Sequence, residues 1–336
     1  MKTKINPISL RESLIPIVIL IVLLGYNVYT YQDEAMNGSN QFILLIGAAI
    51  ACIIGLNKKI LFKSMIDAVS SNIKSITTAI LILLFVGALS GTWLLSGIIP
   101  SMIYYGLQIL HPSIFLPSCL IICAIISVST GSSWTTSATV GIALIGIGRA
   151  IEISDGMVAG AVISGAYFGD KLSPLSDTTN LAPAVSGSNL FSHIKYLTIT
   201  TVPTIIVTLI ILSVVNFLTI PTGPTDHKSL LTTIENTFTI TPLLFTVPLM
   251  VIFMIFKKTP PLIALFIGTI LGGIFAVIFQ SSIITSLSGE SELTFRGAYQ
   301  VILNSITVDT YINSGNVTLN ELFSSGGMKG MLNTIW

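Results

Sequence analysis

The chain has 336 residues, of which 52% are hydrophobic and only 9% are charged, and its mean hydropathy is +0.90. Soluble domains carry about 25% charged residues, so this composition excludes an ordinary soluble enzyme and a disordered chain. The formal net charge of +1 gives no basic surface for nucleic acid. We therefore expect an all-α polytopic membrane protein, a helical bundle surrounded by lipid.

Long apolar segments predict the membrane spans, because a spanning helix needs roughly 20 mostly apolar residues. Basic residues before the first segment resemble the start of a secretory signal, but no small-residue cleavage site follows, so we expect a retained helix. The predicted spans of this single transmembrane domain (1–336) are 13–31, 41–57, 76–99, 114–150 (broken near 131), 156–190 (re-entrant or broken), 194–218, 241–256 and 261–280.

The basic residues of the connections predict the orientation of the chain. Lys and Arg precede the first span and recur in segment 58–75, whereas segment 32–40 has none. The positive-inside rule then predicts a cytoplasmic N-terminus. The same scheme requires 150–195 to enter and leave on the cytoplasmic side, as a re-entrant hairpin or a broken helix pair.

Three further segments carry weaker signals. Residues 58–75 have apolar side chains at helical spacing and predict an interfacial helix, with an ordinary loop helix as the alternative. Residues 281–325 are polar, and we expect them to be rich in loops. The segment Gly326–Trp336 reads as a loop and the start of another span, so the fold is expected to be cut short there.

A few single residues have predicted structural roles. Cys119 and Cys123 share a helix face with no His or acid nearby, which predicts small core residues rather than metal ligands or a disulfide. Trp93 is expected to lie at the membrane interface, as tryptophan often does.

A cluster of hydroxyl residues interrupts the apolar stretch 114–150. The segment Ser127–Thr139 reads SVSTGSSWTTSAT. A helix opened there would expose carbonyl groups and N–H groups that can bind ions, and hydroxyl oxygens suit a hard cation such as Na⁺. The alternative is helix packing by small residues. The candidate ion-binding residues of this segment are Gly131, Ser132, Ser133, Thr135 and Thr136.

A charged stretch follows in Gly165–Ala182, which reads GAYFGDKLSPLSDTTNLA. Charged side chains at bilayer depth usually face a cavity and mark an ion or substrate path, and proline prevents a regular helix throughout. Asp170 or Asp177 can hold either Na⁺ or a proton but not both at once, which is the minimal chemistry of a cation/proton exchanger. Lys171 is a candidate charge partner when the ion is absent. The other candidate ligands are Ser173, Ser176, Thr178, Thr179 and Asn180.

Paired glycines precede this stretch. Gly156–Gly160 and Gly165–Gly169 are successive GxxxG pairs, which let helices approach closely. The sequence alone does not separate static packing from helices that slide.

The two polar segments resemble the NhaC family of sodium/proton antiporters, which includes sodium–lactate/malate–proton exchangers. The resemblance is carried by TGSSWTTSATVGIALIGIG (Thr130–Gly148) and GAYFGDKLSPLSDTTNLAPAVSG (Gly165–Gly187). It implies a fold of inverted repeats, of which this chain would hold one half and part of the second. It also implies that Asp170, Ser173, Asp177, Thr178 and Thr179 belong to the ion pathway, with the Gly131–Thr136 break opposite them.

These observations lead to a secondary antiporter in the cell membrane that exchanges cytoplasmic Na⁺ for external H⁺. We expect no cofactor, and no use of a nucleotide, since no Walker A motif occurs in the sequence. The closest alternative couples Na⁺ and H⁺ to a small carboxylate such as malate or lactate. An inactive truncated remnant, a channel and an intramembrane enzyme are further alternatives, and a homodimer stays open.

Overall fold

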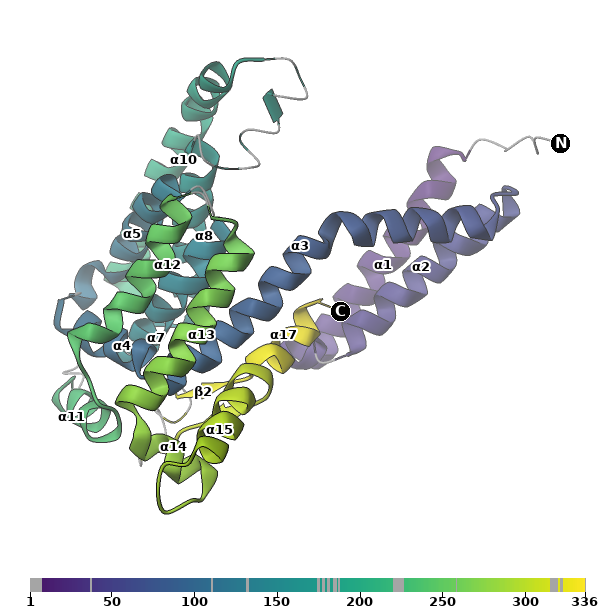
Figure 1. Cartoon of the computed structure of the whole chain (residues 1–336). Helices are drawn as coiled ribbons and strands as arrows, with labels where there is room; N and C mark the ends of the chain where they lie inside the picture. Colours follow the sequence, from purple (N-terminus) through teal and green to yellow (C-terminus); the bar gives the residue numbers. More distant parts are fainter. Residues whose placement is uncertain are drawn as a thin grey trace. The chain divides into compact units, whose positions relative to one another are not determined.

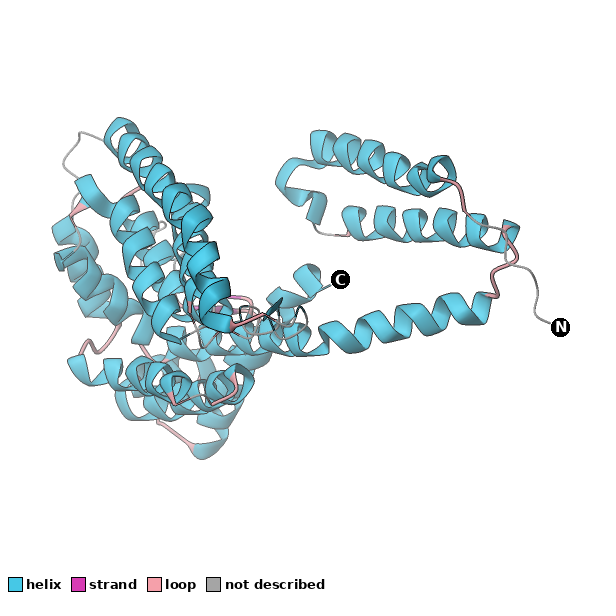
Figure 2. Cartoon of the chain, turned by 90° about the horizontal axis from the view of Figure 1, so that it is seen from above, coloured by secondary structure: helices cyan, strands magenta, loops and turns pink. Residues whose placement is uncertain are grey.

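The computed structural model describes residues 8–335 except 37, 110, 131–132, 174–175, 177–178, 180–181, 184–185, 187, 220–226, 258, 315–319 and 321–322. The described chain is almost entirely helical (Figure 2). Its strands β1 (Thr310–Tyr311) and β2 (Ser324–Ser325) pair antiparallel, with Thr310 opposite Ser325. The chain divides into two compact units, Met1–Leu83 with Met331–Trp336, and Leu84–Gly330.

The first unit is built on a helical hairpin. Helix α1 (Leu10–Tyr31) is followed by the 3₁₀ turn η1 (Gln32–Met36) and α2 (Ser39–Asn57), and the two helices lie side by side (Figure 1). Ser9 and Glu12 form a capping box at the start of α1. The Lys58 ammonium at the end of α2 lies 2.8 Å from the Glu12 carboxylate, which ties the two ends of the hairpin together.

Helix α3 (Phe62–Leu95) is a continuous helix of 34 residues. Most of the helix expected over 58–75 is thus present, from Phe62 on, but it runs without a break into the predicted span 76–99, and its place at the membrane interface stays a prediction. The physical reason for the continuity is the absence of proline and glycine between Phe62 and Val86, which leaves nothing to break the helix.

The second unit contains the remaining helices whose bounds the structure describes. In chain order they are α4 (Ile98–Ile109), η2 (Pro112–Ile114), α5 (Phe115–Thr130), α6 (Ser133–Thr136), the π-helical turn η3 (Ser137–Gly141), α7 (Ile142–Ala150), α8 (Asp155–Leu172), α10 (Leu190–Thr219), α11 (His227–Thr237), η4 (Pro242–Phe245), α12 (Thr246–Phe256), α13 (Pro261–Phe279), α14 (Ser281–Ser288), α15 (Phe295–Thr307) and α17 (Gly327–Ile335), the last of which runs on into the first unit.

Four of the described helices, α1, α2, α10 and α13, are long and apolar enough to cross a membrane. They cover the predicted spans 13–31, 41–57, 194–218 and 261–280. Two further helix pairs pass the same test but are bent, by 72° between Ile80–Leu95 and Ile98–Ile109 and by 85° between Leu231–Thr237 and Pro242–Met254. The described part of the chain thus has the helices of a multi-pass membrane protein.

A buried glutamine holds the bend between α3 and α4. Gly97 has a φ of +79°, and a Cβ at this position would lie 2.4 Å from Gln280 Nε2. Gln280 Nε2 donates to the carbonyl oxygens of Ser96 (3.2 Å) and Thr239 (3.0 Å), and its Oε1 accepts from Thr239 N–H. The predicted span 76–99 therefore ends early, because glycine adopts the left-handed turn that side chains disfavour.

The buried core shows that the prediction for Trp93 is wrong and that the prediction for the two cysteines is correct. Trp93 is not an interfacial residue: it is 1% exposed, and its Nε1 donates to Gly268 O of α13 at 3.2 Å. Cys119 and Cys123 are free, fully buried core residues of α5, as the sequence predicts.

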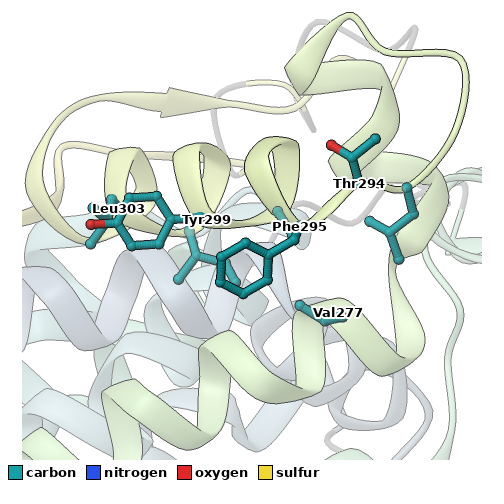
Figure 3. A pocket seen from close by; sticks show the side chains of 8 residues that line it. Val277, Thr294, Phe295, Tyr299 and Leu303 are labelled. Carbon is teal, nitrogen blue, oxygen red and sulfur yellow. The ribbon is translucent and has the colours of Figure 1, made fainter.

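Residues 281–325 contain more helix than the sequence predicts, because α14 and α15 occupy much of the segment. Thr294 caps α15 by accepting from Gly297 N–H at 3.0 Å. Helix α15 packs beside α13, and a largely apolar pocket of about 400 Å³ is lined by Val277 of α13 and by Phe295, Tyr299 and Leu303 of α15 (Figure 3). No charged side chain lines this pocket among the described residues, so it offers no site for an ion.

Candidate functional site

Helices α5 and α8 meet along a face of small residues. A Cβ built on Gly165 would lie 2.2 Å from Leu120 O, and one on Gly169 would lie 2.5 Å from Val128 N. Both neighbours are backbone atoms that cannot rotate away, so only glycine fits. The Gly165–Gly169 pair therefore sets the close approach of the two helices, whereas Cβ atoms on Gly156 and Gly160 would meet nothing within 4 Å.

A buried serine links the two helices through a hydrogen bond. Ser127 is fully buried in α5, and its Oγ donates to Ala166 O of α8 at 2.5 Å. The bond satisfies a polar group that burial would otherwise leave unpaired. Ser127 also lies against Gly169, so the serine fills the space that the glycine leaves open.

The charged stretch and the hydroxyl cluster meet at Asp170. Ser133, the first residue of α6, is buried, and its Oγ donates to Asp170 Oδ2 at 3.0 Å. The Asp170 side chain is half-buried at the end of α8. Two segments separated by 37 residues in sequence thus contribute to one polar cluster.

The chain after α8 supplies buried hydroxyl groups to the same end of the helix. Ser173, Ser176 and Thr179 are buried. Thr179 Oγ1 lies 3.0 Å from Asp170 O and 3.2 Å from Lys171 O, so it donates to the last carbonyls of α8. The last four carbonyl groups of a helix lack partners within it. Thr179 therefore donates to acceptors that burial would otherwise leave without a hydrogen bond.

The predicted site is only partly visible. Ser133, Thr136, Asp170, Ser173, Ser176 and Thr179 are described, and each is buried or half-buried. Thr135 lies in α6, but its side chain is outside the description. The candidates outside the described residues are Gly131, Ser132, Asp177, Thr178 and Asn180.

Lys171 lies on another side of α8 from the Asp170 carboxylate. It is exposed and lines a groove against α10, whereas Asp170 accepts from Ser133 of α6. Adjacent helix residues point about 100° apart, which explains the separation. Pairing of Lys171 with one of the two aspartates when the ion is absent stays a prediction, and Asp177 lies outside the described residues.

The π-helical turn Ser137–Gly141 was not predicted from the sequence. Such turns insert an extra residue into a helix and occur frequently at functional sites. A Cβ on Gly141 would lie 2.8 Å from Val162 Cγ1, so the turn packs closely on α8. The hydroxyl-rich sequence around it was a signal for an interruption, but not for its π geometry.

The cluster around Asp170 offers oxygen atoms and one carboxylate. Hydroxyl, carbonyl and carboxylate oxygens are the ligands that hard cations prefer. Ser133 and Thr179 commit their hydroxyl protons to neighbouring oxygens, so their own oxygens keep lone pairs for a cation. Among the described residues, no three His, Cys, Asp or Glu side chains gather as a metal-binding group.

Comparisons with known proteins identify the family of the chain. The sequence profile of the Na⁺/H⁺ antiporter family matches residues 165–336. The chain is 37% identical over 299 residues to the malate-2H⁺/Na⁺-lactate antiporter of Bacillus subtilis, covering 88% of this chain and 60% of that protein. It is 35% identical over 289 residues to the Na⁺/H⁺ antiporter NhaC of Alkalihalophilus pseudofirmus, covering 86% and 59%.

A third relative is matched over more of its length. The chain is 31% identical over 328 residues to an uncharacterized Na⁺/H⁺ antiporter of Haemophilus influenzae, covering 96% of this chain and 67% of that protein. The chain thus spans 60%, 59% and 67% of the lengths of the three relatives. No solved structure gives a significant match.

Proposed function

Because the chain belongs to the Na⁺/H⁺ antiporter family, we propose that it exchanges cytoplasmic Na⁺ for external H⁺ across the cell membrane. The names of its relatives and its apolar helices support this function. The basic residues before the first span and in segment 58–75 favour a cytoplasmic N-terminus. The energy would come from the two ion gradients, with Na⁺ and H⁺ as the transported substrates.

The observation that carries the proposal is the contact between Ser133 and the Asp170 carboxylate. A carboxylate in a membrane helix is unfavourable unless it faces polar groups or water, so such a residue is a candidate for ion binding. Asp170 supplies the negative charge, and the buried hydroxyl groups around it supply neutral oxygens. Proton binding removes the charge that holds Na⁺, so the two ions compete for one site.

Interrupted helices near Asp170 would let the ion site open to one side of the membrane and then to the other. The backbone is not regular helix at Ser173 and Ser176, and α6 passes into the π turn η3. Irregular backbone at membrane depth is tolerated where it is buried in protein or lines a cavity. In secondary transporters, such breaks coordinate ions while the surrounding elements move. We propose the same role here, with Asp177 as a second sodium ligand.

The test is sodium-dependent proton movement in everted vesicles that contain this chain. The Asp170→Asn variant removes the charge but keeps the shape, and we expect it to lose most of the Na⁺-dependent dequenching of a pH-sensitive dye. Asp177→Asn is expected to behave in the same way.

Asp155→Asn is the matched control, because Asp155 lies at the other end of α8 in an exposed ion pair with Arg149. Exposed ion pairs contribute little to stability, so this variant should transport normally. Dequenching by Asp170→Asn at the wild-type rate, or none by the unmodified chain, would contradict the proposal.

A second candidate function is exchange that also carries a small carboxylate. It is favoured by the relative from Bacillus subtilis, whose name includes malate and lactate, and by the exposed Lys171 beside the site. Uptake of labelled malate or lactate would measure it. Uptake at background, with and without Na⁺, would exclude it.

A further inference from the structure

A groove runs between α8 and α10 on a side of α8 away from the Ser133 contact. It has a volume of about 170 Å³. Each helix contributes residues at spacings of three and four, which place them along one face. The lining residues are Ser164, Tyr167, Phe168 and Lys171 of α8 and Thr201, Thr204, Ile205 and Thr208 of α10.

Lys171 brings a positive charge that no acidic residue neutralises within the described part of the chain. The ion pairs found there involve Lys58, Arg149 and Lys329 instead. Lysine carries three donors and no acceptor. The ammonium group at this end of the groove is therefore available to an anionic ligand.

The threonines of α10 offer the complementary chemistry. Each donates its hydroxyl proton to its own helix: Thr201 to Leu197 O at 2.6 Å, Thr204 to Thr200 O at 2.8 Å, and Thr208 to Thr204 O at 2.9 Å. A hydroxyl group has one donor and two acceptor lone pairs. With their protons committed, the threonine oxygens can only accept a further hydrogen bond.

The groove thus combines a cationic donor with a row of acceptors. A simple anion such as chloride or acetate could use Lys171 but would leave the threonine oxygens unused. A cationic amine could use the threonines but would be repelled by Lys171. A ligand that matches both groups has a carboxylate and a hydroxyl donor.

The volume limits the size of that ligand. One water molecule takes about 30 Å³ in the liquid, so the groove corresponds to roughly five or six waters. This space suits a molecule of three or four carbon atoms, and it lies below the range of about 300–1,000 Å³ that is typical of sites for drug-sized ligands.

We propose that the groove binds a small hydroxycarboxylate of the lactate or malate type. The carboxylate would accept from the Lys171 ammonium, and the hydroxyl would donate to a threonine oxygen of α10. This assignment rests on the second proposed function, exchange of a small carboxylate. It adds a binding site for that carboxylate, separate from the Asp170 cluster.

The first experiment is calorimetric titration of the purified chain in detergent with lactate. We expect saturable binding, weakened about tenfold or more in Lys171→Gln because a charge-assisted hydrogen bond is lost. Lys171→Arg keeps the charge and should keep most of the binding. Lys195→Gln removes another exposed lysine, one on α10 outside the groove, and should bind as the wild type does.

The second experiment tests the hydroxyl contact with propionate, which is lactate without its hydroxyl. We expect the unmodified chain to bind lactate several-fold more tightly than propionate. Thr204→Val removes the acceptor with little change of shape and should reduce this preference. Thr200→Val is the control, since Thr200 is exposed on α10 but does not line the groove. Melting curves of all variants identify any that fail to fold.

Several outcomes would overturn the proposal. They are no lactate binding by the unmodified chain, undiminished binding by Lys171→Gln, and equal affinities for lactate and propionate. The titration is performed without a sodium gradient, so its outcome is independent of the exchange assay. Loss of exchange in Asp170→Asn with intact lactate binding would separate the two sites.

Discussion

Helix α8 meets α5 and α10 in different ways. Toward α5 it presents Gly165, Ala166 and Gly169, and the backbones come so close that added Cβ atoms would overlap backbone atoms. Toward α10 it presents Tyr167, Phe168 and Lys171, and a groove of about 170 Å³ remains. One helix thus combines a closely packed contact with an open one.

The difference indicates that the two contacts of α8 have different roles. Close contacts of small residues fix two helices by many van der Waals contacts, and here a buried hydrogen bond from Ser127 is added. An open contact has fewer such constraints and leaves room for a ligand. The α5 side should therefore govern stability, and the α10 side should govern what the protein binds.

The largest expected effect is that of Gly169→Leu. The Cβ alone would lie 2.5 Å from Val128 N and 2.6 Å from Ala124 O, so α5 and α8 must separate. Overpacking typically costs about 1–3 kcal/mol, and rigid backbone neighbours place this variant at about 3 kcal/mol or above. Thermal unfolding in detergent would measure the loss of stability.

Gly156→Leu is the matched control on the same helix, because a Cβ there meets nothing within 4 Å. Its melting temperature should stay close to that of the unmodified chain. Equal losses from the two variants would show that close packing does not distinguish the α5 face.

The two GxxxG pairs also show what the sequence could and could not predict. Both pairs have the same spacing, yet only Gly165–Gly169 lies against a neighbouring helix. Spacing identifies a small face, but the partner of that face depends on how the helices pack, which local sequence does not specify. For the same reason, Trp93 was predicted at an interface although it packs against α13.

The features that were predicted correctly depend on composition and local chemistry. Apolar length predicted the helices α1, α2, α10 and α13, each of which is long and apolar enough to cross a membrane. The hydroxyl cluster and the charged stretch pointed to Ser133 and Asp170, which the structure brings into contact. Their relation to an inverted repeat stays a prediction, as does the role of Asp177.

Ser127→Ala is expected to have the next largest effect. It removes the hydrogen bond to Ala166 O and leaves a small gap between α5 and α8, so we expect a loss of about 1 kcal/mol. Unfolding in detergent would measure it. Ser118→Ala is the control, since Ser118 is only half-buried on α5 and its Oγ donates to Ile114 O nearby in the sequence. If both variants lose the same stability, the hydrogen bond between α5 and α8 stabilises the protein no more than a hydrogen bond within one helix does.

The smallest effect, and one of opposite sign, is expected for Gly160→Ala. Gly160 is exposed in the middle of α8, where a Cβ meets nothing within 4 Å. Alanine stabilises a helix interior by about 0.5–1 kcal/mol relative to glycine, so the melting temperature should rise slightly. Gly165→Ala should do the reverse, because its Cβ would lie 2.2 Å from Leu120 O. A loss from Gly160→Ala as large as that from Gly165→Ala would mean that the Gly160 face also packs against a partner, and the contrast between the two glycine pairs would then be lost.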